Sequence, residues 1–227
     1  MIKLVAFDWN GTLLSDTNIT WRGGNLELKA CRTRPISMAR FKETFTVPIV
    51  ETLVKNGADR EFCLKNSVML SNVFHNFYES HADKCRTRGG VREILAWLHK
   101  NKIITSIYSN HTLTGINKQL KRLVLSHYMG VVLAHTVIDG AMNNKNKGER
   151  LFEYLKRHKL KPNEIISIGD TDEEIEIGKK YGYHTVAITG GYNSTARLKK
   201  HHPDFLIHNM LELKKIIKKL NNITDKH

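Results

Sequence analysis

The 227-residue sequence predicts an α/β protein, a doubly wound parallel sheet with a helical segment inserted into it. Beyond residue 88, short apolar runs typical of buried strands alternate with segments of helical periodicity, as in folds built around a parallel sheet. A similar apolar run opens the chain, and about seventy residues of mainly helical periodicity separate it from the rest. We therefore expect an α/β core formed by residues 1–15 and 88–227, with a helical cap formed by residues 16–87.

The first expected strand, residues 2–7, is apolar except for Lys3, which suits a strand buried on both faces of a parallel sheet. The run ends in Asp8, and Asn10, Gly11 and Thr12 follow closely. Ligands of open parallel sheets bind at the carboxyl ends of the strands, so Asp8 is a candidate reactive group. Taken alone, this stretch is equally compatible with a structural turn, because Asn-Gly is a common turn pair.

The segment between the first strand and residue 88 predicts helices separated by turns. Residues 21–25, which include two adjacent glycines, predict a loop. Residues 35–45 and 48–54 predict two helices that each begin at a proline. The apolar spacing in residues 60–81 predicts one or two long helices.

The remainder of the chain predicts the alternating part of the fold, and it contains no internal repeat. Apolar runs and helical stripes succeed one another at intervals that suit βα units. The expected strands are residues 103–108, 130–137, 164–168, 184–188 and 204–207, and the expected helices are residues 91–98, 114–124, 149–158, 175–181 and 213–220.

Composition restricts the class of protein. No stretch is apolar and long enough to cross a membrane. The first residues lack the pattern of a secretory signal, because Asp8 interrupts the apolar run, so we expect a cytoplasmic protein. Cys31, Cys63 and Cys85 are widely spaced and form no Cys-x-x-Cys pair, which favours reduced thiols over a zinc site or a disulfide framework.

The net charge of +14 admits nucleic acid as a partner. The densest group of lysines, within residues 214–219, alternates with apolar residues at helical spacing. These lysines therefore fall on the outer face of an amphipathic helix, and a solvated surface is favoured over a binding site. The same charge would favour any phosphorylated substrate, large or small.

Several other expected strands also end in polar residues. Ser109 and Asn110 follow the strand at residues 103–108, and Asp170 follows the strand at residues 164–168. Lys145 and Lys147 lie just ahead of a helix. Because the carboxyl ends of parallel strands meet at one edge of the sheet, we expect these groups to lie near Asp8.

This set of groups predicts a phosphoryl-transfer site. Two converging carboxylates, Asp8 and Asp170, would repel each other unless a cation lies between them. Oxygen ligands without histidine or cysteine favour Mg²⁺. A hydroxyl, a lysine and a metal ion around Asp8 would suit it as a nucleophile. The sequence has no glycine loop followed by Lys-Ser/Thr, so a nucleotide-binding P-loop is not indicated.

Taken together, the motifs resemble those of the haloacid dehalogenase-like superfamily, in particular the phosphoglycolate phosphatase-like members with a helical cap after the first strand. The resemblance covers almost the whole chain and implies a Rossmann-like core. Lys145, two residues from Lys147, stays open as an alternative for the third motif. Asp8-Trp9-Asn10-Gly11-Thr12 resembles the first motif, Ser109-Asn110 the second, Lys147 the third, and Gly169-Asp170-Thr171 through Glu174 the fourth.

The resemblance implies a role for each matched residue. Asp8 would attack phosphorus and form an aspartyl-phosphate. Glu174 would orient metal-bound water, although the neighbouring acidic residues 172–174 also suit a helix N-terminus. The implied catalytic residues are Asp8, Asn10, Ser109 and Lys147, the phosphate-binding residues Thr12, Ser109, Asn110 and Lys147, and the Mg²⁺ ligands Asp8, the Asn10 carbonyl, Asp170 and Glu174.

Asn10 departs from the family pattern. Most phosphatases that the chain resembles have there a second aspartate, which protonates the leaving oxygen and then activates water. An amide cannot exchange a proton in this way, and losing such a group costs about 10²–10⁴-fold in rate. Similar Asp-Trp-Asn-Gly-Thr motifs do occur among relatives grouped with phosphoglycolate phosphatases. A cap histidine, His75 or His81, is an alternative proton donor, although either one also suits an ordinary helix position.

We therefore expect a Mg²⁺-dependent phosphatase that acts on a small phosphorylated metabolite of the phosphoglycolate type. We expect a monomer or weak dimer with no membrane partner. Two alternatives remain open, which are a catalytically weak protein that binds phosphate or nucleic acid, and a phosphatase of nucleic-acid ends. Substrates with good leaving groups should suffer least from the loss of the acid at Asn10.

Overall fold

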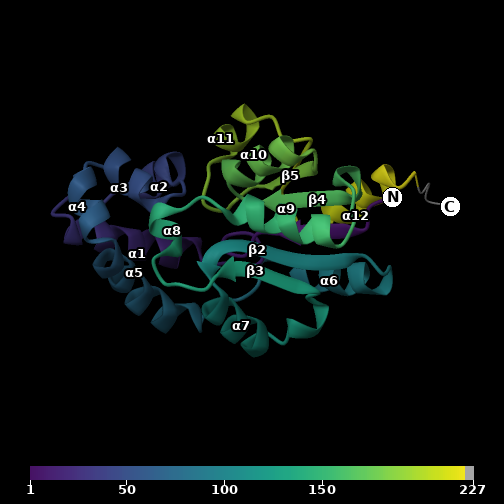
Figure 1. Cartoon of the computed structure of the whole chain (residues 1–227), viewed down its shortest axis with the longest axis horizontal. Helices are drawn as coiled ribbons and strands as arrows, with labels where there is room; N and C mark the ends of the chain where they lie inside the picture. Colours follow the sequence, from purple (N-terminus) through teal and green to yellow (C-terminus); the bar gives the residue numbers. More distant parts are fainter. Residues whose placement is uncertain (223–227) are drawn as a thin grey trace.

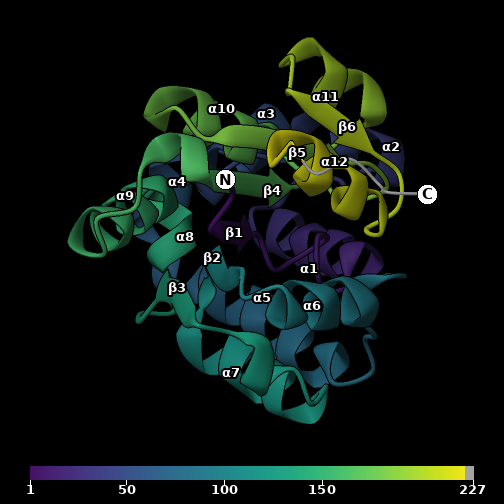
Figure 2. The same ribbon diagram turned by 90° about the vertical axis from the view of Figure 1, so that its right-hand side faces the viewer.

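The structure, a computed structural model, describes residues 1–222. Its centre is a six-stranded sheet in the order β3-β2-β1-β4-β5-β6, and every neighbouring pair is parallel (Figures 1 and 2). The strand order reverses on either side of β1, which confirms the expected doubly wound sheet. The strands are β1 (Leu4–Phe7), β2 (Ile104–Thr112), β3 (Val131–His135), β4 (Ile165–Gly169), β5 (His184–Ile188) and β6 (Phe205–Ile207).

The central strand is covered on both faces, which explains its continuous apolar run. All four residues of β1 are fully buried. Val5 and Phe7 belong to the larger hydrophobic core, while Leu4 and Ala6 belong to a second core on the opposite face. Successive side chains of this strand therefore point into two different cores, as expected for a sheet between two helix layers.

Helices cover both faces of this sheet. Helices α6, α7 and α12 contribute to the larger core, and α9 and α10 contribute to the second. The lysines of α12 alternate with buried Leu213, Ile216 and Ile217, which confirms the amphipathic helix. No helix of residues 1–222 has the length and apolar character that crossing a membrane needs. These helices are α6 (Val91–Lys100), α7 (Leu113–Arg122), α9 (Lys147–Arg157), α10 (Asp172–Tyr181), α11 (Thr195–Lys200) and α12 (Glu212–Leu220), with short turns α8 (Gly140–Asn143), η1 (Ser126–Tyr128) and η2 (Pro162–Glu164).

Five further helices follow β1 and gather at one end of the sheet (Figure 1). They enclose a small hydrophobic cluster of their own, which includes Leu28, Leu53 and Leu70. We call them the inserted helices; the division of the chain into a core and a cap domain stays a prediction. They are α1 (Thr17–Ala30), α2 (Met38–Thr44), α3 (Ile49–Lys55), α4 (Arg60–Lys65) and α5 (Ser67–Ala82).

The loop predicted at residues 21–25 is wrong, because these residues lie within α1. Gly23 faces α5, where a Cβ atom would lie 2.8 Å from the Phe74 ring. The glycine permits a close approach of two helices, so the packing of α1 against α5 overrides the low helix propensity of the glycine pair.

A second close contact, between α10 and β5, gives a test of the core packing. A Cβ atom on Gly178 would lie 2.2 Å from Cγ2 of buried Thr185. We expect Gly178→Ala to lower the free energy of unfolding by about 1–3 kcal/mol, because overpacking outweighs the gain in helix propensity. Denaturant unfolding monitored by circular dichroism measures the change.

Thr185→Ser supplies the matched control for this contact. It removes the Thr185 methyl group but keeps the hydroxyl, whose oxygen lies 2.9 Å from Asp204 Oδ2. Adding Gly178→Ala to the Thr185→Ser protein should therefore cost much less unfolding free energy than adding it to the wild type. Equal losses in the two backgrounds would mean that this methyl group is not the obstacle.

Candidate active site

The carboxyl ends of the central strands bring the predicted polar residues to one place. The register pairs Phe7 with Ile107 on β2 and with Ile168 on β4. Asp8 therefore follows β1 next to Gly169, where β4 ends, and next to the middle of β2, which runs on to Thr112. Asp8 and Ser109 line one cavity, and the Asp170 carboxyl is close enough to raise the pKa of Asp8.

Lys147, the first residue of α9, lies at the centre of this group. Its Nζ lies 3.1 Å from Asp8 Oδ1 and 3.3 Å from Glu173 Oε2, and it also donates to Glu174. Burial alone would lower the pKa of Lys147, but these carboxylates raise it well above its usual value. Lys145 instead pairs with Glu176 near the surface, at 2.7 Å. Of the two lysines left open by the sequence, Lys147 is the one beside Asp8.

The site contains more buried carboxyl groups than this lysine can neutralise. Burial raises the pKa of Asp8 well above its usual value, although Lys147 opposes the shift. Burial, together with Glu174, raises the pKa of Asp170 to about 7. Burial also raises the pKa of Glu173. Lys147 contacts three of the four acids, Asp8, Glu173 and Glu174, so the site favours protonated carboxyls or a bound cation.

This surplus of acid fits a divalent metal ion. Oε1 of Glu173 is buried, and among residues 1–222 nothing donates a hydrogen bond to it. The donor set around Asp8 consists of oxygen atoms, which suits Mg²⁺. Thr12 Oγ1 donates to Asp170 Oδ1 and the Tyr192 amide donates to Asp170 Oδ2, each at 2.6 Å. The chemistry of the residues therefore fits the cation, while the hydrogen bonds hold Asp170 to its neighbours.

The other predicted residues have mixed surroundings. Ser109 Oγ accepts from the His111 amide at 3.1 Å, which leaves its proton free to donate into the cavity. Asn110 donates to Glu173 Oε2 at 2.7 Å. Thr12 is fully buried and supports Asp170. Glu174 accepts from the Thr171 amide and hydroxyl, so it caps α10 as well as pairing with Lys147.

The Asn10 side chain is turned toward a buried network that the sequence did not reveal. Its amide donates to Asp16 Oδ2 and to the Tyr78 hydroxyl, both at 2.6 Å. Asp16 also accepts from the Gly11 amide at 2.7 Å, the Tyr78 hydroxyl at 2.5 Å and the Tyr192 hydroxyl at 3.0 Å. These bonds tie the turn after β1 to α5 and to the loop after β5.

Gly11 is the residue at which this turn admits no side chain. It has φ +76°, and a Cβ atom there would lie 2.2 Å from Asp170 Oδ2. The turn therefore needs glycine both for its backbone conformation and for the space beside Asp170.

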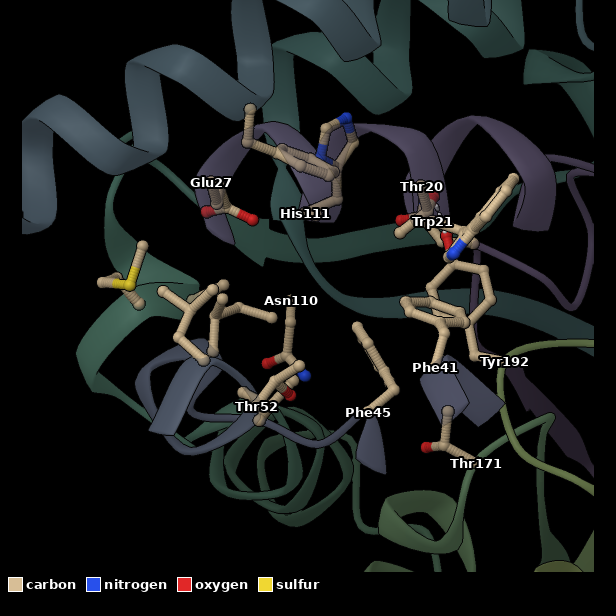
Figure 3. A pocket seen from close by; sticks show the side chains of 18 of the residues that line it. Thr20, Trp21, Glu27, Phe41, Phe45, Thr52, Asn110, His111, Thr171 and Tyr192 are labelled. Atoms are coloured by element: carbon tan, nitrogen blue, oxygen red, sulfur yellow. Dashed lines mark hydrogen bonds between the residues drawn. The ribbon is translucent and has the colours of Figure 1, made fainter. Parts of the chain in front are cut away.

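A cavity of about 120 Å³ joins these residues to the inserted helices (Figure 3). On the scale at which one water needs about 10–15 Å³, it has room for on the order of ten waters, hence for a small substrate. The strand-end side is lined by Asp8, Asn10, Ser109, Asn110, Lys147, Glu173 and Glu174, and the opposite side mainly by Thr20, Trp21, Glu27, Phe41, Phe45, Thr52, Phe74 and His75.

Two histidines face this cavity from different elements. His75 on α5 and His111 near the end of β2 stack with ring centroids 5.3 Å apart. Their ring nitrogens lie 3.6 and 3.1 Å from Glu79 Oε1. Burial alone would raise the pKa of Glu79, but the two imidazoles lower it to about 2. His81, the other histidine considered from the sequence, bonds to the Phe77 carbonyl and is absent from the cavity lining.

The comparisons with known proteins identify the family of the chain. The model of the haloacid dehalogenase-like hydrolases matches residues 5–188. The chain belongs to this family. Phosphoglycolate phosphatase of Photobacterium profundum is 25% identical over 96% of this chain and 96% of its own length. A protein of Caldanaerobacter subterraneus named as a pyrophosphatase, PpaX, is 24% identical over 96% of this chain and 95% of its own length.

Solved structures show the same fold. A haloacid dehalogenase-like hydrolase from Streptococcus pneumoniae matches 95% of this chain and 98% of its own with a TM-score of 0.78, at 18% identity. A protein from Clostridium acetobutylicum described as a predicted phosphatase gives a TM-score of 0.81 over 96% of this chain and 99% of its own, at 16% identity. At these identities the likeness concerns the fold alone.

For a hydrolase of this family, the acid at Glu27 is an unexpected part of the cavity wall. Glu27 is 4% exposed, and burial raises its pKa from 4.5 to about 8. Among the described residues, no group donates a hydrogen bond to its carboxyl. No sequence signal marks this position, because one glutamate in a helix usually faces solvent.

Glu27 therefore predicts a pH-dependent cost in stability. The folded protein holds the Glu27 proton more tightly than the unfolded chain does. The contribution of Glu27 to the free energy of unfolding is therefore most favourable below pH 4.5 and is lost as pH rises toward about 8. Relative to Glu27→Gln, the wild type should lose up to a few kcal/mol of unfolding free energy between about pH 5 and pH 8. Urea unfolding across this range measures the difference. Glu61→Gln, at an exposed position, should instead follow the wild type.

Proposed function

We propose that this chain is a Mg²⁺-dependent phosphatase that hydrolyses a small phosphorylated metabolite through an aspartyl-phosphate on Asp8. The observation that carries the proposal is the buried contact between Asp8 and Lys147 at the wall of a cavity. Membership of the hydrolase family and the phosphatase names of its relatives support it.

Each polar group at the strand ends then has a chemical role. Lys147 favours the ionised form of Asp8, which burial alone would disfavour, and offers a positive charge to the transferring phosphoryl group. The Ser109 hydroxyl donates to a phosphoryl oxygen. Asp8 supplies the attacking oxygen, and the inserted helices keep bulk water from the reacting bond.

The Mg²⁺ ion would be held by Asp8, the Asn10 carbonyl and Asp170. Glu173 and Glu174 complete the acidic surroundings. The Oε1 atom of Glu173 is unpaired among residues 1–222, which makes Glu173 a stronger candidate for a metal ligand than its sequence position suggested. When bound, the metal supplies positive charge for the phosphoryl oxygens.

The matched lysines at positions 145 and 147 provide a direct test. We expect Lys147→Met to lower kcat/KM for p-nitrophenyl phosphate with Mg²⁺ by at least about 10²-fold, because it removes the charge beside Asp8. Lys145→Met should stay near the wild-type value, since Lys145 pairs with Glu176 instead. Circular dichroism confirms that each variant is folded, and equal losses in the two would contradict the assignment.

The nucleophile itself is tested with Asp8→Asn, which preserves the size of the side chain. We expect it to abolish hydrolysis of aryl and acyl phosphates and to prevent acid-stable phosphorylation of the protein, measured by intact-protein mass spectrometry after quenching. A wild-type protein that hydrolyses neither class of substrate in the presence of Mg²⁺ would overturn the proposal.

The missing acid–base group at Asn10 calls for a paired exchange. Asn10→Asp alone would place a carboxylate against Asp16, where the Asn10 amide now donates at 2.6 Å. The two acids would repel each other, so we expect this variant to gain little. In the double variant Asn10→Asp with Asp16→Asn, the amide at position 16 donates and the carboxylate at position 10 accepts, so the pair is again complementary. We expect this variant to raise turnover of alkyl phosphates by about 10²-fold.

Asp16→Asn alone is the control for this exchange, and steady-state kinetics on an alkyl and an aryl phosphate measures all three variants. The gain should be larger for the alkyl ester, whose leaving group needs the proton more. No gain in the exchanged variant would mean that another group, such as His75 or His111 in the cavity wall, already supplies the proton.

The net charge of +14 supports a second candidate, a catalytically weak protein that binds nucleic acid or acts on its ends. Salt-sensitive binding of DNA or RNA that Asp8→Asn leaves unchanged would favour it. The cavity of about 120 Å³ favours the small metabolite, because side chains of the inserted helices line it opposite the strand ends.

A further inference from the structure

The wall of the cavity opposite Asp8 carries a buried acid that has no hydrogen-bond donor among residues 1–222. Glu27 lies on α1 in the same row as Thr20 and Gly24, and all three line the cavity. Figure 3 shows its carboxyl turned toward the cavity. Burial and, more weakly, Glu27 raise the pKa of the Cys31 and Cys63 thiols, which have no positive charge to offer this acid. A buried carboxyl is costly unless something pairs with it, so this position predicts a ligand that donates to Glu27.

The charge balance of the cavity wall restricts that ligand. Lys147 is the one lysine or arginine among the described residues that line it, and its Nζ is already shared by three carboxylates. The imidazoles of His75 and His111 both face Glu79. Within this described lining, no lysine or arginine is therefore left on the Glu27 side to receive a negatively charged group. A substrate carboxylate would be buried there beside an acid.

Aromatic rings line another part of the same cavity (Figure 3). Trp21, Phe41, Phe45, Phe74 and Tyr192 all line the cavity. Phe45 meets Tyr192 edge to face, with ring centroids 4.8 Å apart, and Phe41 packs against both. Ring faces attract cations, and this attraction is strongest where water is excluded. An unpaired acid in a cavity that also contains aromatic rings is suited to an alkylammonium group.

We propose that the substrate is an aminoalkyl phosphate, whose ammonium group binds Glu27 while its phosphate reaches Asp8 and Lys147. This inference rests on the phosphatase function proposed above and names the class of its substrate. Hydrolysis breaks the phosphorus–oxygen ester bond and consumes one water, releasing inorganic phosphate and an amino alcohol. The pKa of about 8 that burial gives Glu27 falls when the ammonium binds, so the complex forms with the carboxylate ionised.

A set of four near-isosteric esters tests the proposal with wild-type protein and Mg²⁺. The probes are 2-aminoethyl, n-propyl and 2-hydroxyethyl phosphate together with 2-phosphoglycolate, which differ in the terminal group. We expect kcat/KM for 2-aminoethyl phosphate to exceed that for the propyl and hydroxyethyl esters by at least about tenfold, with 2-phosphoglycolate the poorest. Equal values, or a preference for the hydroxyl or the carboxylate, would overturn the inference.

Substitutions at Glu27 test whether this residue causes the preference for 2-aminoethyl phosphate. Glu27→Gln and Glu27→Leu should bring the ratio of 2-aminoethyl to n-propyl phosphate close to one, while Glu61→Gln should keep the wild-type ratio. Because the readout is a ratio between two substrates, a general loss of activity does not imitate the effect. A preference that survives both changes at Glu27 would place the ammonium group elsewhere.

Binding to the Asp8→Asn protein separates this inference from the proposed function. Isothermal titration calorimetry should show tighter binding of 2-aminoethyl than of n-propyl phosphate, with proton release near neutral pH for the amine alone. Selective binding without turnover in the wild type would refute the phosphatase and keep the ligand class. Turnover of p-nitrophenyl phosphate without selectivity among the esters would refute the ligand class and keep the phosphatase.

Discussion

One lysine among four buried acids is the interaction on which the site depends. Lys147 contacts Asp8, Glu173 and Glu174, and Asp170 lies close enough to affect the titration of Asp8. Its position at the start of α9 brings it to the carboxyl ends of β1 and β4. Burial raises the pKa of Asp8, and Lys147 opposes that shift by favouring the ionised form. The fold therefore supplies the cation beside Asp8 from a helix that is distant in the sequence.

The second constraint is the hydrogen-bond network around Asp16. Asp16 accepts from the turn after β1, from α5 and from the loop after β5. It thereby fixes the position of Asn10 and links the inserted helices to the strand ends. Asn10 and Asp16 form a donor and acceptor pair, so an acid at position 10 is compatible with the network only if position 16 changes with it. The departure from the family motif is built into its surroundings.

The sheet and its reactive end could be predicted because both depend on local patterns, whereas the missed features depend on long-range packing. Apolar runs marked the strands, and Asp8 follows directly from where the first run ends. The choice between Lys145 and Lys147 needed the start of α9, which aims one lysine inward and leaves the other near the surface. Glu173 resembled an ordinary acid at a helix N-terminus, yet it is buried and faces the lysine. Gly23 suggested a loop, but a neighbouring helix packs against it. Tertiary contacts thus decide roles that periodicity does not specify.

The two ends of the cavity give different kinds of information about function. The strand-end side contains the residues whose motifs resemble those of the family, and the reaction proposed for them does not specify the rest of the substrate. The inserted helices supply the other wall, which contains an acid, Glu27, and several aromatic rings. A carboxylated substrate such as 2-phosphoglycolate needs a free cation at that wall, and the described lining offers an acid. Similarity to phosphoglycolate phosphatases therefore supports phosphatase chemistry, while the proposed class of substrate rests on the charge of the opposite wall.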